Sequence, residues 1–275
     1  MSTATVNGVR LFSTLSGEAG PPLVLVHGSW ADHGDWDLVV PTLAERFRVL
    51  TYDRRGHSQS ERPPGQGSLD EDAADLAALI EHLNLAPAHV VGHSSGGAIV
   101  LRLATRRPDL FRSLSVQEPA LLHLLADHPE HGPAMQENLA RIGAVATRLE
   151  AGDAEGGARQ FIETIALGPG AWEQFPPEVR HLVVGNAATF LDETRDPEPL
   201  TVDLAALAAF PRPVLFTRGD QSHALFAPIV AKLATVLPHA ETRVFVGAGH
   251  LPMLTHPEEY AAAIAAFANA ADCDR

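Results

Sequence analysis

The chain has 275 residues, of which 45% are hydrophobic and 20% are charged, and its formal net charge is −14. This composition is ordinary for a globular protein with a full hydrophobic core and unlike that of a disordered chain. The acidic balance argues against a nucleic-acid partner, because binding to phosphates depends on Lys and Arg, and it argues equally against an anionic membrane surface.

The sequence also bears on location and redox chemistry. No apolar run approaches the ~18 residues of a membrane-spanning helix, and the N-terminus lacks the charged and apolar regions of a signal peptide. We therefore expect a cytoplasmic protein. Cys273 is the only cysteine, so an intramolecular disulfide cannot form. The sequence leaves open whether the protein forms a homodimer.

The first half of the chain alternates between predicted strands and helices. Asn7-Gly8 predicts a hairpin turn between two antiparallel strands, because this pair readily adopts positive φ angles. Apolar runs at 23–26 and 47–52 are typical of strands that are buried on both faces of a parallel sheet. Ser68-Leu69-Asp70-Glu71 is a capping box and predicts the start of a helix.

The same alternation continues in the second half, with further strands predicted at 88–91, 112–117, 213–217 and 242–246. A helix is expected near Leu225 to Leu237, and a second predicted capping box, Thr255 to Glu258, opens a closing helix. Alternating strands and helices predict an α/β fold, with a mostly parallel twisted sheet flanked by helices.

One interval breaks this alternation. The stretch from Glu118 to Pro213 is far longer than the dozen or so residues of a parallel crossover. It contains predicted helices near 135–149 and 158–167. We expect a core domain made of residues 1–119 and 205–275, with residues 120–204 forming a helical cap, or lid, over the C-terminal edge of the sheet.

The aromatic residues of the expected cap allow two interpretations. They could form a core within the cap or face a substrate, and for any one of them a core position is the commoner outcome. We select Trp172 in the cap, together with Trp30 after the first parallel strand, as candidate substrate-binding residues.

The most specific motif is Gly92-His93-Ser94-Ser95-Gly96, which lies between a predicted strand and a predicted helix. A G-x-S-x-G sequence in that context is the nucleophile elbow, a turn tight enough for its central serine to project. Ser94 is therefore the candidate nucleophile. A serine hydroxyl is a weak nucleophile at neutral pH and needs a neighbouring base.

With this elbow and strand order, the chain resembles the α/β-hydrolase superfamily. Supporting segments are His27-Gly28-Ser29-Trp30 after the first parallel strand, Asp53 to Ser58 after the next, and Gly249-His250 after the last. Residues 107–118 also look like a segment of the lactone hydrolases that open zearalenone. The resemblance implies a serine hydrolase whose cap is inserted after the strand that follows the nucleophile helix.

The resemblance also implies roles for individual residues. His250 would be the base, because it lies in a loop at the edge of the sheet where Ser94 emerges. The backbone amides of Ser29 and Ser95 would form the oxyanion hole.

Two carboxylates compete for the third position of the triad. Many relatives have an aspartate three residues after a glycine that follows the penultimate strand, and Ser222 has that spacing from Gly219 here. This counts against the neighbouring Asp220. Glu118 follows the strand after the nucleophile helix, where haloalkane dehalogenases and the zearalenone lactone hydrolases have a glutamate. We prefer Glu118 and keep Asp220 as the alternative acid.

Neither a metal nor a cofactor is expected. His123, His128 and His131 could suggest a metal site, but their irregular spacing and the lack of cysteine partners argue against one. The resemblance implies no cofactor, and the only partner expected is a small-molecule substrate.

We predict that the protein cleaves a carboxylic ester or lactone of a small, largely apolar substrate through an acyl-enzyme intermediate. Carbon–carbon bond hydrolysis and cofactor-free haloperoxidase activity use the same set of residues and stay open. A ligand-sensing protein on the same fold is an alternative of another class.

Overall fold

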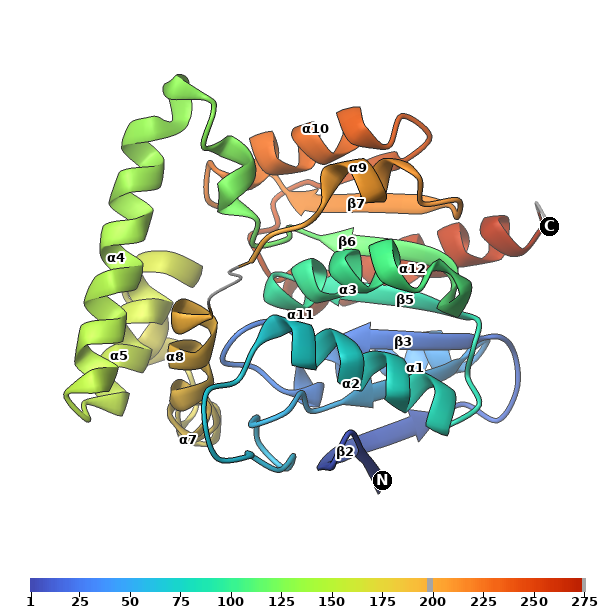
Figure 1. The fold of residues 1–275 in the computed structure, drawn as a ribbon, viewed down its shortest axis with the longest axis horizontal. Coiled ribbons are helices and arrows are strands. Elements are labelled where there is room, and N and C mark those ends of the chain that lie inside the picture. Colours follow the sequence, from blue (N-terminus) through green and yellow to red (C-terminus); the bar gives the residue numbers. More distant parts are fainter. Residues whose placement is uncertain (197–199, 274–275) are drawn as a thin grey trace.

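The computed structural model describes residues 1–196 and 200–273. A single sheet runs through the centre, helices cover both of its faces, and a further group of helices lies beyond the C-terminal ends of the parallel strands (Figure 1). The order of its eight strands is β1-β2-β4-β3-β5-β6-β7-β8. The predicted α/β-hydrolase architecture is confirmed.

The sheet is antiparallel at one edge and parallel elsewhere. β1 pairs with β2 through the predicted turn at Asn7-Gly8, and β2 pairs antiparallel with β4. All further pairs, from β4 across to β8, are parallel. The strands are β1 (Ser2–Val6), β2 (Val9–Ser16), β3 (Pro22–Val26), β4 (Arg48–Tyr52), β5 (Ala88–His93), β6 (Phe111–Gln117), β7 (Val214–Gly219) and β8 (Glu241–Phe245).

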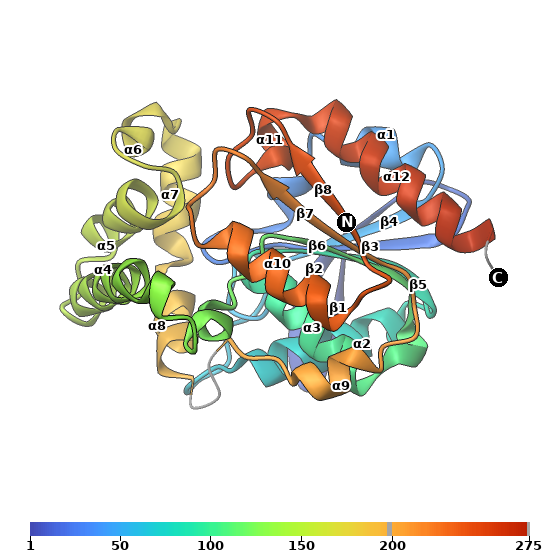
Figure 2. The same ribbon diagram turned by 90° about the horizontal axis from the view of Figure 1, so that it is seen from above.

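Each face of the sheet is covered by its own group of helices and its own cluster of buried apolar side chains (Figure 2). One group comprises α2 (Leu69–His82), α3 (Ser95–Arg106), α9 (Leu204–Ala208) and α10 (Phe226–Val236). The other comprises α1 (Val40–Ala44), α11 (Pro252–Thr255) and α12 (Pro257–Cys273). No helix within the described ranges is both long enough and apolar enough to span a membrane.

Of the two predicted capping boxes, one is confirmed and one is wrong. The Ser68 hydroxyl accepts a hydrogen bond from the Glu71 amide at the start of α2. Thr255 instead ends the short helix α11, and its hydroxyl donates to the Leu251 carbonyl. Since α12 begins only at Pro257, Thr255 is too early to cap it.

The helices between β6 and α9 pack around a third apolar cluster, to which Trp30 from the loop after β3 also belongs. They are α4 (Gly132–Glu150), α5 (Ala154–Phe161), α6 (Ala171–Gln174), α7 (Pro177–Gly185) and α8 (Ala187–Arg195), with short turns at Leu122–Leu125, Pro129–His131 and Ile162–Ala166. This group lies beyond the strand ends that carry the candidate catalytic residues (Figure 1).

Truncation of a β3 side chain tests the position of the core. Leu25 is fully buried in the cluster shared with α1 and α12, so Leu25→Ala should lower the free energy of unfolding by about 2–5 kcal/mol in urea denaturation. Leu38, which is 56% exposed, provides the control, and Leu38→Ala should change that free energy by no more than about 0.5 kcal/mol. Equal effects would contradict a central position for β3.

Candidate active site

Ser94 occupies a strained turn between β5 and α3. Its φ of 54° and ψ of −120° lie in a region that non-glycine residues rarely adopt, at a cost of about 1–3 kcal/mol. Its amide donates to the Gln117 carbonyl at 3.0 Å, which ties the turn to the end of β6. The turn also needs Gly96, because a Cβ there would lie 2.4 Å from the His27 carbonyl oxygen. The half-buried Ser94 thus sits in the geometry of a nucleophile elbow.

Glu118 and His250 form a buried pair at the ends of β6 and β8. Oε2 of the fully buried Glu118 lies 2.6 Å from His250 Nδ1, and its Oε1 accepts a hydrogen bond from the Gly219 amide at 2.7 Å. An ionised carboxylate can only accept hydrogen bonds, so Nδ1 carries the proton. The other nitrogen, Nε2, is then left with a free lone pair and can act as a base.

Two rings hold the imidazole of His250 in place. Phe226 stacks on it with ring centroids 4.5 Å apart, and His93 lies at the same centroid distance in a tilted arrangement. His93 Nε2 is 3.1 Å from the His250 carbonyl oxygen. Burial, reinforced by the nearby His250, lowers the pKa of His93 well below its usual value. A neutral His93 therefore donates to that carbonyl.

His93 links Ser94 to His250. It directly precedes the serine in the chain, and its ring contacts the ring of His250. Within residues 1–196 and 200–273, no hydrogen bond joins the Ser94 hydroxyl directly to the imidazole. Such contacts are often long without substrate and tighten in the complex.

Asp220, the alternative acid, has a different environment. It is exposed, and its Oδ1 accepts hydrogen bonds from the Gly247 amide at 2.7 Å and from Gln221 Nε2 at 3.2 Å. The carboxylate thus stabilises the turn after β8. The structure brings Glu118, rather than Asp220, to the His250 ring.

The two predicted oxyanion donors flank the elbow. Gly28 packs so closely on it that a Cβ would lie 3.1 Å from that of Ser94, which places the following residue, Ser29, beside the nucleophile. Ser95 is the first residue of α3. In the part of the chain that the structure describes, neither amide donates to another residue. Their role as an oxyanion hole stays a prediction.

Both candidate substrate-binding tryptophans lie in the apolar cluster of the inserted helices. The Trp30 ring lies 5.0 Å from that of Phe161 and 5.1 Å from that of Phe190, and Trp172 is only 2% exposed. Most of their surface is therefore covered by protein. Their contact with a substrate stays a prediction.

An open cavity of about 680 Å³ lies between the inserted helices and the loops after β7 and β8. His250 lines it, whereas Ser94 is not among its described lining residues. Its apolar wall is made of Ala140, Ala144, Ile165, Ala166 and Leu167. Of its charged residues, Arg141 is paired with Glu137.

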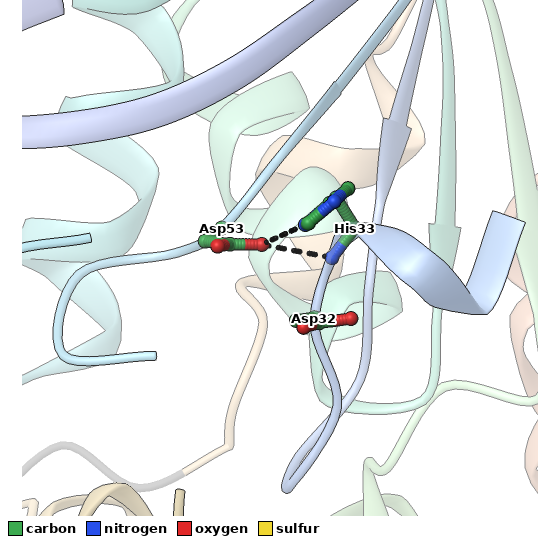
Figure 3. Close-up of side chains that lie close together, drawn as sticks. All are labelled: Asp32, His33 and Asp53. Carbon is green, nitrogen blue, oxygen red and sulfur yellow. Dashed lines mark hydrogen bonds and ion pairs between the residues drawn. The ribbon is translucent and has the colours of Figure 1, made fainter. Parts of the chain in front are cut away.

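A group that could hold a cation is found elsewhere. Asp32, His33 and Asp53 offer ligand atoms within 4.8 Å of one another (Figure 3). Protein donors already use these carboxylates: Asp53 Oδ1 accepts from the amide and ring of His33, and Asp32 caps the turn at Gly34. The group is explained as a link between the loops after β3 and β4.

Of the three histidines considered in the sequence as metal ligands, His128 and His131 lie near each other beside Glu130.

Sequence reasoning missed a buried polar contact between α8 and the core. Asn186 at the start of this helix donates to the Ala31 carbonyl at 2.9 Å, Thr189 contacts His57, and Glu193 pairs with the fully buried Arg54. The three residues of the inserted segment follow one another at intervals of three and four, which places them on one helical face. This spacing of polar residues along a predicted helix was the feature of the sequence that could have indicated a polar helix face in contact with the core.

Comparisons with known proteins identify the family of this chain. A model of the alpha/beta hydrolase fold family matches residues 21–257, and the chain therefore belongs to this family. A thermophilic esterase from Thermogutta terrifontis is 26% identical with a TM-score of 0.76, and the match covers 98% of this chain and 97% of that one. The enol-lactonase from Burkholderia xenovorans LB400 is 21% identical with a TM-score of 0.77, covers 97% and 99%, and shows the fold alone.

Several curated relatives match over shorter segments. The dihydrolipoyllysine-residue acetyltransferase component of the acetoin cleaving system of Pseudomonas putida is 44% identical over 102 residues, which are 37% of this chain and 28% of that protein. The chain spans 28% to 45% of the length of such relatives. Proteins named as hydrolases, among them a soluble epoxide hydrolase from Corynebacterium, are relatives of this chain within the same match range.

The buried neutral His93 predicts a specific pH dependence of stability. Because its pKa is lowered in the folded state, the unfolded chain takes up a proton that the folded chain does not, and stability is lost as the pH falls below about 6.5. His93→Gln removes this group. Between pH 7.5 and 5.5, wild type should therefore lose about 1.4 kcal/mol relative to the variant in urea denaturation. A difference that is independent of pH would contradict the neutral state.

Proposed function

We propose that this protein is a serine hydrolase that cleaves a carboxylic ester or lactone through an acyl-enzyme, with Ser94, His250 and Glu118 as its triad. The observation that carries the proposal is the fully buried Glu118 carboxylate on His250 Nδ1, at the strand ends where Ser94 adopts its positive φ. Such a carboxylate fixes the tautomer in which the opposite nitrogen is a base.

In the first half of the reaction, the Ser94 hydroxyl attacks the substrate carbonyl while His250 Nε2 takes its proton. The new C–O bond converts the carbonyl into a tetrahedral oxyanion, which the amides of Ser29 and Ser95 stabilise. The intermediate collapses as the C–O bond to the leaving alcohol breaks. That alcohol receives the proton from the imidazolium, whose charge Glu118 stabilises.

In the second half, water attacks the acyl-enzyme with His250 again as the base. The carboxylic acid leaves, and the Ser94 hydroxyl regains its proton. In a lactone the leaving hydroxyl belongs to the same molecule, so the product is one hydroxy acid. This scheme requires no cofactor or metal.

The substrate class is part of the proposal. The apolar wall of the cavity beside His250 favours a small and largely apolar compound, as is usual for sites that bind small molecules. The esterase and the enol-lactonase that share this fold support ester or lactone cleavage. The inserted helices would act as the cap over this site, and Trp30 and Trp172, which do not line the cavity beside His250, would contact the substrate from the apolar cluster of the cap.

Covalent labelling tests the nucleophile. A fluorophosphonate should add one phosphonyl group to the wild type, and Ser94→Ala should abolish the labelling, because only an activated serine reacts readily. Intact mass and peptide mapping give the result. Labelling that persists in Ser94→Ala would contradict the proposal.

Turnover separates an enzyme from a ligand sensor. Before labelling, the protein should hydrolyse a short-chain nitrophenyl ester well above the background rate. After labelling with the fluorophosphonate, hydrolysis should fall to the background rate. Reaction with the fluorophosphonate but no turnover of any ester or lactone offered would favour the sensor.

Paired amide variants test the acid. Glu118→Gln should lower kcat by up to about 10⁴-fold, because an amide at this position favours the wrong imidazole tautomer. Asp220→Asn should change kcat only a few-fold, since Asp220 contacts the Gly247 turn instead. Steady-state kinetics on the same ester provide both values. A severe defect in the second variant alone would assign the acid to Asp220.

A further inference from the structure

Arg54 places a buried positive charge against residues 27–30, the loop after β3 that carries Ser29 and is here called the oxyanion loop. Its side chain is fully buried and pairs with two carboxylates, Asp72 at 3.1 Å and Glu193 at 3.0 Å. Desolvation raises the pKa of Asp72 to about 7. Glu193 comes from α8 of the inserted segment, so one of the two partners lies outside the α/β core.

The guanidinium also contacts the peptide unit that presents the first oxyanion donor. Arg54 Nη2 donates to the Gly28 carbonyl at 3.1 Å, and His27 Nδ1 lies 2.8 Å from the same oxygen. The Arg54 amide donates to His27 Nε2, so the proton of this ring is on Nδ1 and also points to Gly28. The Gly28 carbonyl and the Ser29 amide belong to one planar peptide. Holding the oxygen therefore aims the N–H of Ser29.

Glu193 contacts the side chain of Ser29. Its Oε2 accepts a hydrogen bond from the Ser29 hydroxyl at 2.5 Å, while Oε1 accepts from Arg54. One carboxylate thus bridges the side chain of Ser29 and the cation that fixes the preceding carbonyl. The same Arg54 nitrogen lies 3.3 Å from the Ser95 hydroxyl, on the residue that carries the second donor.

We propose that Glu193 is a positioning residue for the oxyanion hole, through which α8 of the inserted segment holds the Ser29 amide in its productive orientation. This inference rests on the proposed function. Glu193 acts through Ser29 and Arg54 and does not touch the reacting atoms. Its effect falls on the transition state, because the amide binds an oxyanion that exists only there.

The next residue in the chain supplies a matched control. Asp192 also pairs with an arginine from the segment after β4, since its Oδ2 accepts from Arg62 at 2.7 Å. Arg62 is 38% exposed, whereas Arg54 is fully buried, and the hydrogen bonds described for Asp192 go to Arg62 and Gln66 rather than to Ser29 or Arg54. Asp192→Asn therefore removes one charge and one ion pair from the same helix without disturbing Ser29.

The test compares Glu193→Gln with Asp192→Asn in the full chain. Glutamine has nearly the same shape, but one of its two terminal atoms is a donor, so it cannot accept from Ser29 and Arg54 through separate oxygens, and it removes the ion pair with Arg54. Since one oxyanion donor contributes about 10²–10³ in kcat, partial misalignment should lower kcat for a nitrophenyl ester by about tenfold or more, with KM little changed. The affinity for phenylboronic acid, which forms a tetrahedral serine adduct, should fall in parallel. Asp192→Asn should change neither quantity more than about twofold.

A second variant guards against a folding defect. Ser29→Ala removes the other end of the bridge and leaves the Glu193–Arg54 pair intact, so it should also lower kcat and boronate affinity. Thermal melting of all three variants shows how far each effect follows from stability.

The outcomes separate the two proposals. Equal kcat and KM for Glu193→Gln and Asp192→Asn would overturn the positioning role, and so would a lower Tm of Glu193→Gln without loss of boronate affinity. In either case, Ser94-dependent labelling would still support the hydrolase. Absence of Ser94-dependent labelling in the wild type would overturn both.

Discussion

A single buried carboxylate joins three strand ends at the centre of this site. Glu118 follows β6, accepts from the amide of Gly219 at the end of β7, and binds the imidazole of His250 from the loop after β8. A carboxylate without these donors would be costly at this depth. The hydrogen bonds that satisfy it also fix the orientation of His250. The architecture of the α/β core therefore determines which nitrogen of that ring is free to act.

The parallel sheet explains how distant residues meet. Glu118 and His250 are 132 positions apart in the chain, yet the carboxyl ends of parallel strands lie at one edge, where ligands of open α/β sheets bind. Close packing then sets the relative positions of the loops. Gly96 lies against the end of β3, and Gly28 lies against Ser94, so that the elbow and the loop after β3 pack directly on each other.

Local signals in the sequence were sufficient for most of the core. The Asn7-Gly8 turn and the Ser68 cap depend on nearby residues alone, and both form as expected. Thr255 has the same local pattern, but its hydroxyl donates to the Leu251 carbonyl in the preceding helix α11. The four-residue pattern does not show which of the two helices will use this hydroxyl. The environments of Glu118 and Asp220 could not be separated by motif spacing either, because they depend on how the β7 and β8 loops fold over β6.

The contact between α8 and the core depends on tertiary packing and shows what sequence reading omits. Three polar residues on one face of this helix, of which Asn186 and Thr189 are buried and Glu193 is partly buried, contact loops more than 120 positions earlier in the chain. A helical segment beside an active site is easily regarded only as a cover. Here its polar face contacts Ser29 and Arg54, and in our proposal these contacts position a group that stabilises the transition state.

The most direct test of this mechanism is a crystal structure of the protein after reaction with a fluorophosphonate. The phosphorus should be bonded to Ser94 Oγ, with one phosphonyl oxygen about 2.7–3.1 Å from the amides of both Ser29 and Ser95, and Glu118 should still hold Nδ1 of His250. Phosphorus on another side chain, or an oxygen directed away from both amides, would contradict it.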